Sequence, residues 1–81
     1  MRVGDGMLTR RVKAEFIKRE LDTSSLEVRV IHGVAYLGGE LRNTRANRIY
    51  DWKREMAIIE DMIYKINGVR GIDNRIKCVT I

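Results

Sequence analysis

Four side chains in this sequence could in principle take part in catalysis: His32, Glu40, Asp73 and Cys78. Acid–base catalysis needs groups that converge, and Glu40 and Asp73 fall on different predicted strands with no partner at a useful spacing. His32 stands beside a glycine in a predicted turn and has no orienting partner. Cys78 follows Lys77 on a predicted strand with no activating group, so we expect a small, buried apolar side chain. The sequence therefore predicts a protein without enzymatic activity.

Metal and cofactor chemistry are not expected either. One cysteine and one histidine can form neither an internal disulfide nor a zinc cluster. The segment Gly68-Val69-Arg70-Gly71 has the G-x-x-G spacing of the loop with which KH domains clamp a nucleic-acid backbone. That loop joins two helices, whereas this segment joins a predicted helix to a predicted strand. We interpret it as the stop signal of the helix.

The distribution of charge gives the strongest indication of binding. The chain has 81 residues and a net charge of +5. Two segments, residues 10–19 and 42–54, each carry +4, which leaves −3 on the remaining residues. Such segments attract the phosphates of nucleic acid, lipid headgroups or acidic proteins. For the first segment, a solvated helix face explains the charges better than a binding surface does.

Aromatic residues accompany the arginines of the second segment. Tyr50 and Trp52 follow Arg42, Arg45 and Arg48, at the predicted start of a helix whose free N–H groups also favour anions. This combination suits contact with a lipid interface and equally suits stacking and phosphate contact with single-stranded nucleic acid; Trp52 could instead pack in the core. The candidate anion-binding residues are Arg10, Arg11, Lys13, Arg42, Arg45, Arg48 and Trp52.

A β-hairpin over residues 26–41 is the element that organises the rest. Apolar and polar residues alternate on both sides of His32-Gly33, and the glycine suits a two-residue turn. Leu26, Val28 and Val30 are predicted to share one face, and so are Ala35, Leu37, Gly39 and Leu41. Consecutive glycines at 38 and 39 predict a bulge or the close approach of a helix backbone.

Two helices are predicted around this hairpin. The first covers residues 5–21, with Asp5 as its N-cap and Leu8, Val12 and Phe16 on the buried face, which Ala14, Ile17 and Leu21 broaden. The second covers residues 44–66, because apolar residues recur at three- and four-residue steps from Ile49 to Ile66. At about 34 Å it would be longer than strands of about 26 Å and would overhang the sheet near Arg45 to Trp52. Asn67-Gly68 would end it.

The remaining strand is predicted from Val69 or Ile72 to Ile81. A right-handed crossover through the second helix makes it parallel to the second strand of the hairpin. The predicted fold is α+β in the order αββαβ, with two helices on one face of a mixed three-stranded sheet. A chain of this length makes one domain, residues 1–81, which could have been excised from a longer protein. No signal peptide or membrane-spanning helix is expected.

The motifs of this chain resemble those of the BON domain of bacteria. The first helix contributes Asp5, Leu8, Val12 and Phe16. The hairpin contributes V-x-x-G-x-A-x-L-x-G-x-L from Val30 to Leu41, and the end of the chain contributes G-V-x-x-I-x-N-x-I from Gly68 to Ile76. Two departures are His32, where the family has Asn before the turn glycine, and a second helix predicted to be about two turns longer. The resemblance implies a docking module of the kind found in envelope and osmotic-stress proteins, with no catalytic residues.

Three hypotheses for function follow. In the first, basic helix surfaces bind anionic phospholipid or an envelope protein partner, in a bacterial envelope or periplasm as the resemblance implies, with the cytoplasm as the alternative. In the second, the chain is a KH-like nucleic-acid binder. In the third, it is an assembly module whose long second helix forms a homo-oligomer through residues 45–63, burying Ile49 and Trp52 between copies.

Overall fold

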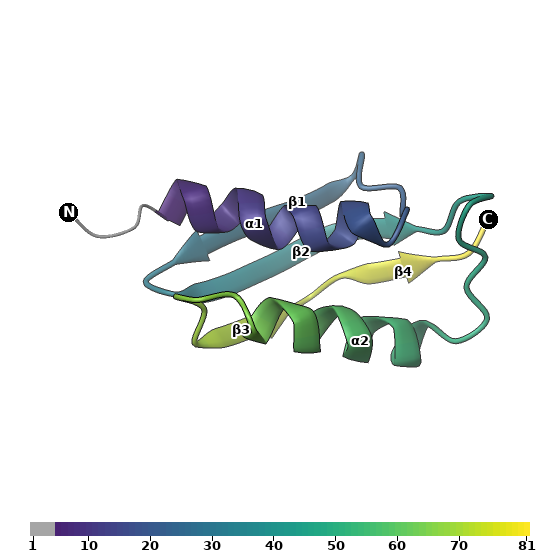
Figure 1. The fold of residues 1–81 in the computed structure, drawn as a ribbon. Helices are drawn as coiled ribbons and strands as arrows, with labels where there is room; N and C mark the ends of the chain where they lie inside the picture. Colours follow the sequence, from purple (N-terminus) through teal and green to yellow (C-terminus); the bar gives the residue numbers. More distant parts are fainter. Residues whose placement is uncertain (1–4) are drawn as a thin grey trace.

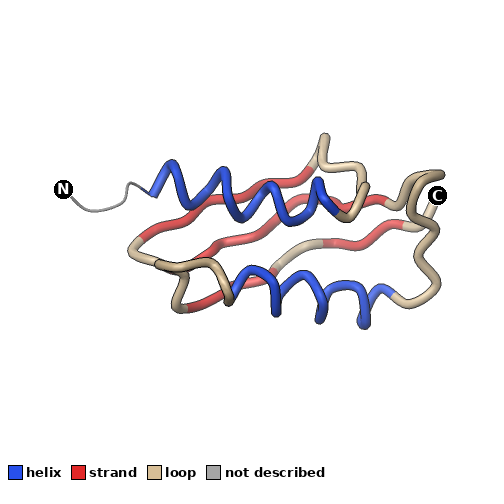
Figure 2. The backbone as a smooth tube through the Cα atoms, viewed as in Figure 1, coloured by secondary structure: helices blue, strands red, loops and turns tan. Residues whose placement is uncertain are grey.

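The computed structural model describes residues 5–81, as two helices packed on one face of a mixed β-sheet (Figures 1 and 2). The predicted α+β class and the order αββαβ are confirmed, the final strand being divided in two. The elements are α1 (Asp5–Lys18), β1 (Leu26–Ile31), β2 (Val34–Arg42), α2 (Trp52–Tyr64), β3 (Gly71–Asn74) and β4 (Lys77–Val79).

Strand β2 is the centre of the sheet. Strand β1 pairs with it antiparallel on one side, and β3 and β4 pair with it in parallel on the other. The parallel pairing confirms the predicted crossover through α2, because a helix must carry the chain back to the start of the sheet. In Figure 1 helix α1 lies over the β1 side and α2 over the β3 and β4 side. No helix of the described residues lies on the opposite face of the sheet.

The core lies between this helix pair and the sheet. Val12, Phe16, Leu41, Ile59 and Ile63 are fully buried in it, and the predicted inward faces of both hairpin strands are confirmed. Burial of this apolar surface is the main source of stability. Ile17 is an exception to the prediction: it points away from the core and is 56% exposed. Its position lies on the outer half of α1, where Arg10 and Lys13 are also exposed.

The hairpin turn is formed by His32 and Gly33, as predicted. Both have positive φ, 50° and 81°, which is the requirement of a two-residue type I′ turn. A side chain at Gly33 would also meet the Gly68 carbonyl oxygen, 2.8 Å from an added Cβ. Histidine is tolerated at the first turn position because a single non-glycine residue can adopt this conformation at modest cost.

Gly39 explains both the double glycine and the division of the last strand. Its φ is +77°, and an added Cβ would overlap the Ser25 carbonyl oxygen. Leu26 pairs with Gly39 and Asp22 pairs with Arg42. Between these two pairs, residues 23–25 lie opposite residues 40–41, so the ladder contains a bulge. The close approach therefore comes from the turn before β1 and not from a helix. Strands β3 and β4 share one register against β2 and are interrupted opposite Gly38 and Gly39.

The predicted long helix over residues 44–66 is wrong at its start. Helix α2 begins at Trp52, and the Asp51 side chain caps it by accepting from the Arg54 backbone N–H. Residues 43–51 form a loop, because Thr44 and Asn47 bond to backbone outside any helix, as short polar side chains readily do. The apolar spacing misled the prediction, since Ile49 packs on the core from this loop. Consequently α2 neither overhangs the sheet nor carries the added turns.

Two smaller predictions concern the helix ends. Helix α2 ends at Tyr64 with Lys65 as its C-cap in a right-handed conformation, so Gly68 lies beyond the helix and does not cap it. Helix α1 ends at Lys18, earlier than the predicted Leu21. The predicted N-cap role of Asp5 concerns a side chain that lies outside the described part of the chain.

Candidate functional site

Residues 43–51 form a folded loop at one end of the molecule, which we call the basic corner. In Figure 1 this loop lies beside the C-terminus, at the end opposite the hairpin turn. Thr44 and Asn47 exchange two backbone hydrogen bonds of 3.2 Å, which close a tight turn. Arg45 stands in that turn and Arg48 follows it. The arginines are therefore carried by a closed loop and not by a helix.

Side-chain hydrogen bonds fix the basic corner to the end of α1. The Thr44 hydroxyl donates to the Glu20 carbonyl at 2.6 Å, and the Asn47 amide donates to the Arg19 carbonyl at 2.7 Å. On the other side, the Asn43 side-chain oxygen accepts from the Ile81 backbone N–H at 2.7 Å. These bonds hold the loop from two directions, so Arg45 and Arg48 project from a rigid base.

A partly buried ion pair between Arg19 and Glu55 completes the support of the basic corner. Arg19 donates to both oxygens of Glu55, at 2.7 Å each, and Asn47 donates to the same carboxylate at 3.3 Å. Glu55 is 7% exposed. A buried carboxylate is retained only when its oxygens are satisfied in this way. The pair therefore joins the end of α1, the basic corner and the first turn of α2.

The ion pair also shifts the pKa values of its members. The hydrogen bonds from Arg19 lower the pKa of the Glu55 carboxyl, although its burial acts in the opposite direction. The hydrogen bond with Glu55 raises the pKa of Arg19. Both groups are thus charged at neutral pH. Glu55 was not among the predicted site residues, and Arg19 was predicted to be a solvated charge. The burial of Glu55 could have been predicted from its position on the apolar face of the helix, three residues after Trp52 and four before Ile59.

The outer surface of the basic corner is hollowed and basic. A concavity of about 590 Å³ is lined by Asn43, Thr44, Arg45, Arg48, Ile49, Tyr50, Thr80 and Ile81. Arg45 and Arg48 are exposed, and no ion pair engages either of them in the described residues. Tyr50 is 95% exposed. The corner thus places two unpaired guanidinium groups beside an aromatic ring.

The other predicted members of this segment lie elsewhere. Arg42 is at the end of β2, where it forms an ion pair of 2.9 Å with Glu40. Trp52 packs against the core, and its indole N–H donates to the Thr80 hydroxyl at 2.8 Å. The Asp51 carboxylate occupies the N-terminus of α2, so the expected attraction of an external anion to that helix end is offset by a residue of the chain itself.

The structure does not bring the two predicted basic groups together. Arg10, Arg11 and Lys13 are exposed on the first half of α1. The basic corner instead bonds to Arg19 and Glu20, which follow the last turn of α1 (Figure 1). Arg11 borders a groove of about 410 Å³ between the helices, and Lys13 lies on the β1 side. The seven candidate residues therefore occupy several separate surfaces.

The four residues considered for catalysis remain apart as well. Glu40 pairs with Arg42, and Asp73 pairs with Arg75 at 3.3 Å. Cys78 is partly buried, which raises the pKa of its thiol and so disfavours the nucleophilic thiolate. Across residues 5–81, no group of three His, Cys, Asp or Glu side chains is arranged to hold a metal ion.

The G-x-x-G segment is used within the fold. The Arg70 backbone N–H donates to the Gly33 carbonyl and its guanidinium donates to the His32 carbonyl, both at 2.8 Å. The segment is thereby attached to the hairpin turn. None of the described helices is long and apolar enough to cross a membrane.

The chain belongs to the BON domain family. The family model matches residues 4–48, which comprise α1, the hairpin and the first part of the basic corner. The resemblance found in the sequence motifs is thus confirmed. Membership favours a non-enzymatic, envelope-associated module.

One solved structure shares the fold. It is described as CdsD, a structural protein of the type III secretion system of Chlamydia trachomatis, and it is 14% identical with a TM-score of 0.69. The match covers 98% of this chain and 34% of that one, so this chain spans about a third of the length of the chain it matches. No curated protein sequence matches this chain.

Proposed function

We propose that this BON domain is a docking module that attaches to anionic phospholipid surfaces through its basic corner. The observation that supports this most directly is the pair of unpaired guanidinium groups, Arg45 and Arg48, beside the exposed ring of Tyr50. Arginine binds phosphate through several donors at once, and an aromatic ring favours the headgroup level of a bilayer. The loop that presents them is already folded, which lowers the entropy cost of binding.

Two neighbouring cations add to the positive charge at the same end of the molecule. Lys53 and Arg54 are exposed on the first turn of α2, directly after the basic corner. The proposal thus differs from the expectation of basic helix faces, since the main contact is a loop. Binding would be shallow and electrostatic, with roughly 1 kcal/mol for each basic residue near the surface.

Co-sedimentation with vesicles tests this proposal. We expect binding to phosphatidylglycerol-containing vesicles at low salt, weaker binding at high salt, and little binding to phosphatidylcholine alone. The double variant Arg45→Glu/Arg48→Glu should bind at least about 30-fold more weakly, because it removes two positive charges and adds two negative ones. Arg10→Glu/Arg11→Glu makes the same change of charge on α1 and is the matched control.

Three outcomes would contradict the proposal. Equal binding to anionic and neutral vesicles would exclude electrostatic attachment. An equal loss in both double variants would show that the basic corner has no special role. Binding to mixed oligonucleotides that exceeds vesicle binding and is lost in Arg45→Glu/Arg48→Glu would assign the same surface to nucleic acid.

A further inference from the structure

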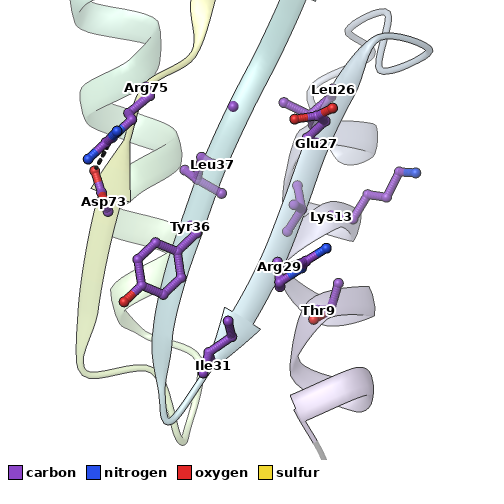
Figure 3. Close-up of a pocket in the computed structure, with 12 residues that line it drawn as sticks. Thr9, Lys13, Leu26, Glu27, Arg29, Ile31, Tyr36, Leu37, Asp73 and Arg75 are labelled. Atoms are coloured by element: carbon purple, nitrogen blue, oxygen red, sulfur yellow. Dashed lines mark hydrogen bonds and ion pairs between the residues drawn. The ribbon is translucent and has the colours of Figure 1, made fainter.

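The face of the sheet opposite the helices carries an ordered pattern of charge. Six residues define this helix-free face: Glu27, Arg29, Tyr36, Gly38, Asp73 and Arg75. They line a shallow hollow of about 850 Å³ that faces solvent, and further residues of β1 and β2 together with Thr9 and Lys13 of α1 complete its edge (Figure 3). Tyr36 stands in its middle and is 43% exposed. The proposed attachment to lipid does not involve this surface.

Strand register arranges the six residues in two rows. Arg29 pairs with Tyr36 and Tyr36 pairs with Asp73, so the first row reads cation, ring, anion. Glu27 pairs with Gly38, and Arg75 follows Asn74, the partner of Leu37. The second row therefore reads anion, gap, cation, and Figure 3 shows Arg75 and Glu27 on opposite sides of β2. The rows lie about 6.7 Å apart.

This pattern is complementary to itself. Consider two copies placed face to face, with a two-fold axis between them that runs perpendicular to β2 and midway between the rows. The axis exchanges the rows, so Arg29 of each copy lies over Glu27 of the other and Asp73 lies over Arg75. Tyr36 of each copy then lies over Gly38 of the other. Such an isologous contact is the commonest symmetry of homo-oligomers.

We infer that the helix-free face binds a second copy of this chain in this arrangement. Gly38 provides the space that the opposing Tyr36 ring needs, since an added Cβ there would meet only the Glu27 carboxylate, at 3.6 Å. Arg29 and Glu27 form no ion pair within the described part of the chain, so each gains a partner from the other copy. The Asp73–Arg75 pair of 3.3 Å gains a second, inverted pair above it.

The charge balance favours a copy over other occupants. The two cations and two anions of the six residues cancel, and Lys13 at the α1 edge of the hollow adds a single positive charge, so the surface attracts a polyanion such as nucleic acid only weakly. Three short strands offer less area than a standard interface, and the dimer should be weak and reversible. The strands of the two copies run antiparallel, as aligned sheets allow, and the basic corners remain free at opposite ends.

Sedimentation equilibrium over a wide concentration range tests the inference. We expect the mass to rise from 9.4 kDa towards twice that value. Gly38→Leu, which fills the gap, and Tyr36→Ala, which removes the ring, should each raise the dissociation constant about tenfold or more. Arg10→Glu, on α1 and outside the lining of the hollow, is the control and should leave the dimer unchanged. Circular dichroism confirms that each variant is folded.

A charge exchange tests the geometry. Arg29→Glu and Glu27→Arg should each be monomeric, because like charges then oppose one another across the axis. An equimolar mixture of the two should dimerise again, since the carboxylate introduced at position 29 of one variant faces the guanidinium introduced at position 27 of the other. An axis parallel to β2 would place Arg29 over Asp73 and predicts no recovery.

Several results would overturn the inference. A mass that stays at 9.4 kDa at all concentrations would exclude the dimer. A dimer that survives Gly38→Leu, Tyr36→Ala and Arg29→Glu alike would place the contact on another surface. Failure of the mixed charge variants to associate would exclude the proposed axis.

Discussion

The two basic segments carry the same net charge in sequence but form different surfaces in the fold. In residues 10–19, Arg19 forms the partly buried pair with Glu55 and Lys18 bonds Glu15 at 3.1 Å, while Arg10 and Arg11 lie on a helix. In residues 42–54, Arg42 pairs with Glu40, and Arg45 and Arg48 project from a loop that the first segment helps to hold. The end of the first segment thus holds the basic corner in place, and the second segment supplies the exposed arginines of that corner.

This difference shows that charge counted along a chain does not measure charge available for binding. A carboxylate distant in sequence, such as Glu55, engages an arginine that would otherwise be free to bind a ligand. What remains depends on which cations face carboxylates across the fold. The comparison predicts that changes in the shared support affect stability, whereas changes of the exposed arginines affect binding.

The largest effect is expected from Glu55→Gln. The neutral amide cannot receive two charge-assisted bonds from Arg19, so the free energy of unfolding should fall by about 2 kcal/mol. Urea denaturation measures this change. Asp61→Asn removes an exposed pair with Lys65 and should change stability by less than about 0.5 kcal/mol. Equal losses in the two variants would show that the pair does not join the two segments.

A comparable effect is expected from acid. Because the folded-state pKa of Glu55 is lowered, its contribution is fully present above the unfolded value of about 4.5. It is lost as pH falls below that value and through the folded pKa. Wild type should therefore lose more stability than Glu55→Gln between about pH 5 and the acid transition. Urea denaturation at a series of pH values measures this difference. If the free energy of unfolding falls equally with pH in wild type and Glu55→Gln, Glu55 is not the group responsible.

A smaller loss is expected from Asn47→Ala. The amide makes two hydrogen bonds, to the Arg19 carbonyl and to Glu55, and its removal should cost about 1 kcal/mol. The basic corner should also become more mobile, which hydrogen exchange at the backbone of residues 44–48 would detect. Protection equal to that of wild type would mean that the hydrogen bonds of Thr44 and Asn43 are sufficient to hold the loop.

The smallest effect on stability is expected from Arg45→Ala and Arg10→Ala. Both side chains are exposed, and each change should stay within about 0.5 kcal/mol. Thermal denaturation measures this. A larger loss in Arg45→Ala would show that this arginine supports the fold and is not free for binding, which would remove the distinction between the two segments.

Much of the fold was predictable from local pattern. The hairpin followed from alternation around His32-Gly33, the buried face of α1 from the spacing of Leu8, Val12 and Phe16, and the parallel last strand from the handedness of the crossover. The family was also recognisable, because its motifs consist of these same core and turn residues. Such features depend on neighbours one to four residues away, which the sequence displays directly.

The start of α2 and the composition of the candidate site were decided by contacts that are distant in sequence. Ile49 continued a helical spacing, but Thr44 and Asn47 find better partners at the end of α1 than a helix would give them. Arg19 and Glu55 are 36 residues apart, and no local pattern joins them. Likewise, the alternation of Tyr36 and Gly38 was visible in the strand, but the strand register alone placed Asp73 and Arg75 beside them. The sequence determined which faces are buried; the tertiary structure decided which charges remain free, because ion pairing depends on distance in space.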